Sequence, residues 1–295
     1  IEKISVNPEF EAESLQFSFS PRLPRLKSKN LTIYLQNQLS YHYRFNITHL
    51  NSYLKCPLCF FFKTILRLPY PKAKAMSFGT AVHGALAYLT QVYKSQNKLI
   101  SQEKFVDVFE NNLKRENLSE NDFNSLLDHG REILSGYYQN YRDSFNGRCL
   151  TEHDFKFNNV YLDEIPITGK IDKIEFLSGK QVNVVDYKTG KPDYKYQQLS
   201  PEGDYFRQLV FYKLLCDEAK TFPYKVVSGT IDFIEANKKN QYIRKNYKIT
   251  SEDTAKLKSQ IVEVFNKIKS LDFTPSPKCE DKDHLHILFG KYFKS

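Results

Sequence analysis

Two short apolar segments, 165–177 and 181–190, carry the residues whose types and spacing could do chemistry. Asp172 lies on the first segment, and Asp186 and Lys188 lie on the second. Both segments are rich in β-branched residues and are bounded by turn formers, so they predict a β-hairpin. Because side chains alternate along a strand, Asp186 and Lys188 are expected to share one face of it.

The register of this hairpin decides whether the two aspartates meet. A three-residue turn centred on Gly179 pairs residues whose numbers add to 358, which sets Asp172 opposite Asp186 on the face that carries Lys188. Carboxylates that face each other at about 5 Å repel one another. A divalent cation with oxygen ligands relieves that repulsion, and Lys188 beside it suits orienting a water or stabilising charge on a phosphate.

Two alternatives stay open for this hairpin. A two-residue turn would shift the pairing by one residue and place the two aspartates on different faces. A surface hairpin with ordinary solvated charges would accept any mixture of charges at these positions. The metal interpretation therefore depends on the turn.

Composition and charge bound the class of protein. The chain has 295 residues, of which 41% are hydrophobic and 15% aromatic, which is enough for a real core and excludes a disordered tail. A net charge of +9 and a pI near 9.1 favour a polyanionic partner, with nucleic acid ahead of an acidic membrane surface. The sequence holds no apolar run of 18 residues and no secretory-type apolar segment, so no membrane association is expected.

The chain's first residue and its cysteines indicate its setting. Because the chain begins with Ile1, we expect an excised or processed piece of a longer polypeptide. Five scattered cysteines do not suggest a disulfide framework, so a reducing, cytoplasmic location is expected.

The periodicity of the chain predicts an α/β fold, with a central mixed β-sheet flanked by helices. Helices are expected at 52–66 with an interruption near Cys56, and at 77–94, 101–115, 121–142, 205–219 and 251–270. Strands are expected between 151 and 188 and in a second hairpin at 225–236 and 241–249. Residues 1–45 are interpreted as an N-terminal arm or linker, and 46–295 as one domain with a helical insertion at about 95–150.

Five separated motifs follow one another along this domain. They are Asn51-Ser-Tyr-Leu-Lys-Cys56-Pro57-Leu-Cys-Phe60, Gly79-Thr80-Ala-Val-His83, Gly169-Lys-Ile-Asp172, Asp186-Tyr-Lys188-Thr-Gly190 and Gln208-Leu-Val-Phe-Tyr212. Their order and spacing over roughly 46–295 resemble the RecB-type nuclease domain of the PD-(D/E)XK superfamily. That domain, with its restriction-endonuclease-like core, stands at the C-terminal end of helicase–nucleases of the AddA, AddB and RecB classes.

The resemblance implies a role for each matched residue. The implied catalytic residues are Asp172, Asp186, Lys188, Gln208 and Tyr212, and the implied metal ligands are His83, Asp172, Asp186 and the backbone carbonyl of Tyr187. One or two Mg²⁺ or Mn²⁺ ions would bind there, and Lys188 would position the attacking water and stabilise the phosphate. Glu152 matches a place where some relatives carry an acid, and is kept as an outer-shell or second-metal group. Each assignment has a plainer alternative: His83 as a core or capping histidine, and Gln208 and Tyr212 as a polar stripe on an amphipathic helix.

The function that the resemblance implies is a metal-dependent DNA nuclease, expected to be an exonuclease in DNA repair or recombination. Its expected partners are DNA that is single-stranded or has single-stranded ends, and a helicase motor in the same polypeptide or complex. The chain itself contains no Gly-x-x-x-x-Gly-Lys-Ser/Thr loop, so it is not the motor. Two alternatives are a catalytically inactive DNA-binding module on the same scaffold and a hydrolase of a small anionic substrate.

The cysteines raise a second metal question. Some relatives hold an iron–sulfur cluster, and Cys56 and Cys279 stand where two of its four ligands would be, but the remaining cysteines are missing. Zinc held by Cys56, Cys59, Cys279 and His284 or His286 is an alternative. We expect neither, and instead a lost site replaced by apolar packing.

Overall fold

The computed structural model describes residues 33, 35–37, 39, 43–69, 71–276 and 279. The chain divides into two units between Tyr43 and Arg44. The expected arm at 1–45 lies for the most part outside the described residues, as do His284 and His286. The larger unit carries every other element discussed below.

Helices make up the first half of this unit, and further helices lie between and after the strands. They are α3 (Ile47–Lys55), α4 (Pro57–Phe60), the π-helical turn η1 (Phe61–Ile65), α5 (Lys74–Gln96), α6 (Gln102–Leu113), α7 (Glu120–Tyr141), the 3₁₀ turns η2 (Arg142–Ser144) and η3 (Pro192–Tyr194), α8 (Asp204–Glu218) and α9 (Ser251–Lys269). The strands are β1 (Cys149–Asp154), β2 (Val160–Leu162), β3 (Ile165–Ile167), β4 (Lys170–Phe176), β5 (Gln181–Lys188), β6 (Lys225–Phe233) and β7 (Arg244–Lys248). Every helix and both hairpins expected from the periodicity are present within the described residues.

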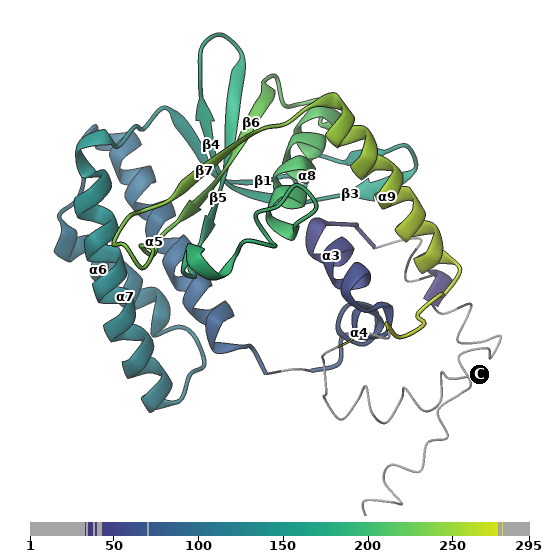
Figure 1. Ribbon diagram of the computed structural model, residues 1–295, viewed down its shortest axis with the longest axis horizontal. Coiled ribbons are helices and arrows are strands. Elements are labelled where there is room, and N and C mark those ends of the chain that lie inside the picture. The colour runs from purple at the N-terminus through teal and green to yellow at the C-terminus, as the bar shows by residue number, and fades with distance from the viewer. Residues whose placement is uncertain are drawn as a thin grey trace, which may run out of the picture. The chain divides into compact units, whose positions relative to one another are not determined.

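A five-stranded sheet with the order β1-β4-β5-β6-β7 forms the centre of the unit (Figure 1). The pair β5–β6 is parallel and the other pairs in this sheet are antiparallel, so the sheet is mixed. Parallel neighbours need a crossover, and α8 supplies it between β5 and β6. The expectation of an α/β fold with a mixed sheet flanked by helices is confirmed.

The register of the β4–β5 hairpin follows the three-residue turn. Lys173 pairs with Val185, so paired residue numbers add to 358 as expected. Gly179 occupies the turn with a φ of 63°, a conformation that glycine adopts without strain. Asp172 and Asp186 are the next pair in this register, just beyond the last bonded pair of the ladder.

The first arm of the hairpin differs from the expected single strand. It is broken between β3 and β4, and β3 pairs with β2 in a separate two-stranded sheet. The break lies at Gly169, where a Cβ atom would lie 3.0 Å from Leu215 Cδ2 of α8. The chain therefore bends at a residue that has no side chain to collide with this helix.

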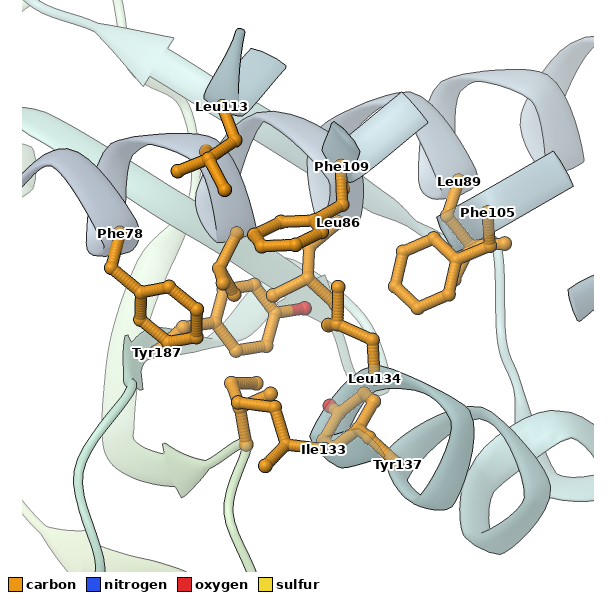
Figure 2. Packing of buried hydrophobic residues seen from close by; sticks show 14 of the residues in the cluster. Phe78, Leu86, Leu89, Phe105, Phe109, Leu113, Ile133, Leu134, Tyr137 and Tyr187 are labelled. Atoms are coloured by element: carbon orange, nitrogen blue, oxygen red, sulfur yellow. The ribbon is translucent and has the colours of Figure 1, made fainter. Parts of the chain in front are cut away.

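Helices α5, α6 and α7 bury a large apolar cluster against one face of the sheet (Figure 2). Phe78, Phe105 and Phe109 contribute rings from the first two helices, and Tyr187 joins them from β5. Burial of such aromatic side chains is the main favourable contribution to the stability of this half of the fold.

Helix α8 lies against the other face, followed by α9 (Figure 1). It approaches β6 closely at Gly229, where a Cβ atom would lie 2.9 Å from Leu209 Cβ. Helix α9 begins at Ser251, as expected, and Thr250 is its N-cap. Thr250 and Asp253 form a reciprocal capping box there.

Phe109 tests the aromatic cluster. Its side chain is fully buried, and its ring lies where a side chain on Gly130 would have to be. Phe109→Ala is expected to lower the free energy of unfolding by about 3–5 kcal/mol, because it leaves a cavity among rigid neighbours. Urea denaturation followed by circular dichroism measures this change. Phe157→Ala, at a ring that is 85% exposed, is the control and should change stability by less than about 0.5 kcal/mol; a similar loss in both variants would contradict the assignment.

Candidate active site

The sequence-predicted residues converge where β4 begins and β5 ends. Because the side chains alternate, Asp186 and Lys188 face α8, whereas Tyr187 between them points into the aromatic cluster under α5. The antiparallel neighbour β4 brings Asp172 to the same end of the sheet. The site therefore lies at the carboxyl end of β5, where Tyr187 is anchored in the core.

One group of ligand-type side chains gathers around Asp172. Donor atoms of His83, Glu152 and Asp172 all lie within 4.8 Å of one another. His83 reaches the sheet from α5, and its Nδ1 lies 3.2 Å from Asp172 Oδ1. The other carboxylate oxygen of Asp172 accepts the backbone N–H of Tyr187 at 2.9 Å, which fixes the orientation of the carboxylate.

Glu152 enters this group from β1. Its neighbours Thr151 and His153 pair with β4 on either side, which places Glu152 opposite Asp172. Its φ of 52° lies in the left-handed region, which a side-chain-bearing residue adopts at a cost. Lys170 forms an ion pair with its carboxylate. Such strain is retained where the surrounding structure holds it, and functional sites are its usual location.

A second group centres on a buried ion pair. Lys188 Nζ lies 2.7 Å from Asp186 Oδ2, and the side chain of Asp186 is only 2% exposed. The hydroxyl of Tyr212 donates to Asp186 Oδ1 at 3.1 Å. Gln208, one turn earlier on α8, donates to Tyr212 Oη at 2.7 Å and accepts from Lys188 Nζ at 2.9 Å. The four side chains form a closed ring of three hydrogen bonds and one ion pair.

The charge state of Lys188 follows from this ring. Burial lowers the pKa of Lys188, but the adjacent Asp186 carboxylate outweighs it, so the pKa stands above its ordinary value. The ammonium also lies 4.6 Å from the ring centroid of Tyr205, a cation–π contact that stabilises the charge. Lys188 is therefore a cation at neutral pH, suited to donating to an anion and unsuited to acting as a base.

Burial and neighbouring charges shift the pKa values of Asp186 and His83. Complete burial raises the pKa of Asp186, with Lys188 opposing that shift. Burial lowers the pKa of His83, but its contact with Asp172 outweighs this and the pKa is raised. Both groups would gain from a divalent cation nearby, which stabilises a buried carboxylate and holds an imidazole in its neutral form.

The residues present fit a divalent metal ion. One imidazole nitrogen and carboxylate oxygens from two strands already lie within a single ion's reach. Oxygen donors with one histidine suit Mg²⁺ or Mn²⁺, and the histidine favours Mn²⁺ somewhat.

The structure brings most of the predicted residues together. His83, Asp172 and Glu152 form one group, and Asp186, Lys188, Gln208 and Tyr212 form the other. The metal role expected for the Tyr187 carbonyl stays a prediction. Sequence reasoning missed Tyr205, although its position three residues before Gln208 on the same helix was a usable signal.

A cavity of about 280 Å³ lies on the opposite face of the sheet. It is lined in part by Tyr187, Asp232 and Arg244. Asp232 Oδ2 accepts a hydrogen bond from Tyr137 Oη at 3.0 Å and forms an ion pair with Arg244 Nε, also at 3.0 Å. Burial raises the pKa of Asp232 to about 6. Because β5 separates this cavity from Asp186 and Lys188, it is not the candidate active site.

The cysteines of the possible second metal site also meet. The sulfur atoms of Cys56, Cys59 and Cys279 lie within 4.8 Å of one another, with Cys59 Sγ at 3.5 Å from Cys279 Sγ. Burial raises the pKa of the Cys59 thiol. A fourth ligand from His284 or His286 would lie outside the described residues, so the expectation of no cluster and no zinc stays a prediction.

Comparison with known proteins identifies the family. Residues 44–281 match the model of the PD-(D/E)XK nuclease superfamily, and the chain belongs to it. No curated protein matches the chain.

Solved structures resemble the chain at low sequence identity. The crystal structure of a candidate exonuclease from Eubacterium rectale is 10% identical, with a TM-score of 0.51, and the match covers 87% of this chain and 93% of that one. The crystal structure of SSO0001 is 13% identical, with a TM-score of 0.32, and the match covers 83% of this chain and 88% of that one. The first likeness supports the fold.

None of the helices in the described part of the chain combines the length and apolar character needed to cross a membrane.

Glu152 provides a test of the first group. Glu152→Gln keeps the shape of the side chain and removes its charge, so it is expected to weaken Mn²⁺ binding about ten- to hundredfold. Isothermal titration calorimetry measures the affinity. Asp154→Asn, at an exposed carboxylate two residues further along β1, is the matched control. Equal affinities for both variants and the original protein would leave Glu152 as no more than the partner of Lys170.

Proposed function

We propose that the chain is a metal-dependent DNA nuclease domain that hydrolyses phosphodiester bonds at the end of β5. One observation carries the proposal. The possible metal ligands His83, Glu152 and Asp172 and the charged Lys188 lie at the same end of the sheet. A cation-binding group beside a fixed ammonium suits a reaction in which negative charge develops on a phosphate. Membership of the nuclease superfamily supports the same conclusion.

Each side chain has a defined task in this proposal. His83, Asp172 and Asp186 would hold one or two divalent ions, with Glu152 beside them and the carbonyl of Tyr187 completing the ligand set. A bound Mg²⁺ or Mn²⁺ would neutralise the phosphate, lower the pKa of a bound water and stabilise the leaving oxygen.

Lys188 would donate to a phosphate oxygen or to the attacking water. Because it is charged before the substrate arrives, it needs no proton transfer to play this part. Gln208 and Tyr212 fix where the ammonium and Asp186 point, since each bonds to one member of the ion pair. Their proposed role is therefore positioning. Gln208 is less buried than Tyr212 and is also proposed to contact DNA.

The proposed substrate, mode of cleavage, partner and location of the protein rest on its sequence. The net charge of +9 favours DNA as a polyanionic partner. The five ordered motifs resemble the RecB-type domain, and on that resemblance we propose exonuclease activity, a role in DNA repair and a helicase motor in the same polypeptide or complex. A cytoplasmic location is proposed from the cysteine usage.

Substitutions in the ion pair test catalysis. Lys188→Ala is expected to slow degradation of linear DNA about 10²–10³-fold, as loss of a fixed charge-stabilising donor does, and Asp186→Asn at least as much. Degradation with Mg²⁺ or Mn²⁺ is followed on gels and should stop with chelator. Lys213→Ala removes a buried lysine of α8, whose ion pair with Asp217 lies outside the site, and serves as the control. Undiminished cleavage by folded Lys188→Ala and Asp186→Asn proteins would refute the assignment.

The catalytically inactive DNA-binding module is the second candidate. The approach of His83, Glu152 and Asp172 to within 4.8 Å of one another argues against it. Calorimetry with Mn²⁺ separates the two: the nuclease should take up the ion, and His83→Ala should weaken uptake at least about tenfold. DNA binding with no measurable Mn²⁺ uptake would favour the inactive module.

A further inference from the structure

Two exposed tyrosines lie in the loop that follows the site. The 189–203 loop connects β5 to α8, and within it Tyr194 is 64% and Tyr196 is 76% exposed. Single exposed apolar side chains are ordinary. Here, two large aromatic rings in one short loop present flat apolar faces to solvent. The loop begins immediately after Lys188.

Contacts with a neighbouring turn hold one of these rings in place. The 237–240 turn connects β6 to β7, and Lys238 Nζ lies 4.8 Å from the ring centroid of Tyr194. The backbone N–H of Lys238 donates to Asp193 Oδ2 at 3.0 Å. Asn237 Oδ1 accepts two backbone N–H groups of its own turn at 2.9 Å. The ring is therefore positioned by two connected loops, which lowers the entropy that a ligand must remove on binding.

The surface around the rings is positively charged. The 189–203 loop and the 237–240 turn contribute Lys191, Lys195, Lys238 and Lys239, against Asp193, Glu202 and the nearby Glu235. Lys191 lies 3.5 Å from Glu235, and Asp193 accepts a backbone N–H. Within the described residues neither Lys195 nor Lys239 has an ion-pair partner, so both charges are available to an anion.

This surface lies within reach of the proposed cleavage point. Lys195 Cε lies 3.5 Å from where a Cβ atom on Gly190 would be, and Gly190 is two residues beyond Lys188. Tyr194 is six residues beyond Lys188, so their Cα atoms are at most about 22 Å apart. A strand of a few nucleotides spans that distance.

We propose that the 189–203 loop and the 237–240 turn bind single-stranded DNA, with bases stacked on Tyr194 and Tyr196 and phosphates beside Lys195 and Lys239. This deepens the proposed nuclease function and rests on it for the claim that the bound strand is the substrate. Bases in a duplex already stack on one another, whereas those of a single strand have free faces for a tyrosine ring. The surface therefore selects single strands and single-stranded ends for the site.

Binding in the absence of metal tests this selection without cleavage. Fluorescence anisotropy in chelator compares a labelled oligodeoxythymidylate with a blunt duplex of the same length. The double variant Tyr194→Ala/Tyr196→Ala is expected to lose at least about tenfold in affinity for the single strand, since each stacked base contributes about five- to hundredfold. Its affinity for the duplex should stay the same. The double variant Tyr194→Phe/Tyr196→Phe keeps both rings and should bind the single strand nearly as the original protein does.

Two further variants sharpen the comparison. Tyr161→Ala removes a ring of β2 that is 48% exposed and lies outside both loops, and should leave both affinities unchanged. Lys195→Ala/Lys239→Ala should reduce the slope of log affinity against log salt by about 1.4 for the single strand, because each phosphate contact contributes about 0.7.

The outcomes separate this inference from the nuclease assignment. Unchanged single-strand affinity in the Tyr194→Ala/Tyr196→Ala protein, or equal losses for single strand and duplex, would overturn the stacking surface even if Lys188-dependent cleavage is observed. Ring-dependent binding of single strands by a protein that cleaves no DNA would support the surface and overturn the nuclease assignment. Melting temperatures equal to that of the original protein confirm that these surface variants are folded.

Discussion

The buried ion pair between Asp186 and Lys188 is the interaction on which the site depends. Removing two charges from water is costly, and their attraction offsets that cost only when further hydrogen bonds satisfy both groups. Tyr212 supplies one to the carboxylate and Gln208 supplies one to the ammonium, so α8 must lie where it does for the pair to be tolerable. The same arrangement keeps Lys188 charged and fixed in position. An ammonium preorganised in this way is what a reaction at a phosphate can use.

The tripeptide 186–188 also couples the site to the core. Alternation along β5 directs Asp186 and Lys188 towards α8 and directs the Tyr187 ring into the aromatic cluster under α5 (Figure 2). The backbone of Tyr187 in turn orients Asp172 through its N–H. His83 arrives from α5, which packs on the same cluster. The geometry of the proposed metal site is therefore set by packing on both faces of a single strand.

Much of this could be predicted from local patterns. Helix periodicity located α6, α7 and α9 to within a few residues, because each buries one apolar stripe. Helices α5 and α8 were located as closely, although α8 is buried on all sides from Leu209 to Cys216. The Gly179 turn gave the correct hairpin register, since a three-residue turn leaves little choice of pairing. The break at Gly169 was not predicted, because it depends on contact with Leu215, which is distant in sequence. Tyr205 was overlooked for a related reason: only the packing of α8 brings its ring to Lys188.

The sequence by itself determined the strand alternation, the residue types at the site and the family to which the motifs point, because these follow from chemistry within short segments. Tertiary structure decided which of those residues share a ligand sphere. Glu152 joins His83 and Asp172 because the pairing of β1 with β4 sets it opposite Asp172. Asp186, by contrast, is engaged by Lys188 and α8. Contacts between segments far apart in the chain depend on how whole layers pack, and no local pattern contains that information.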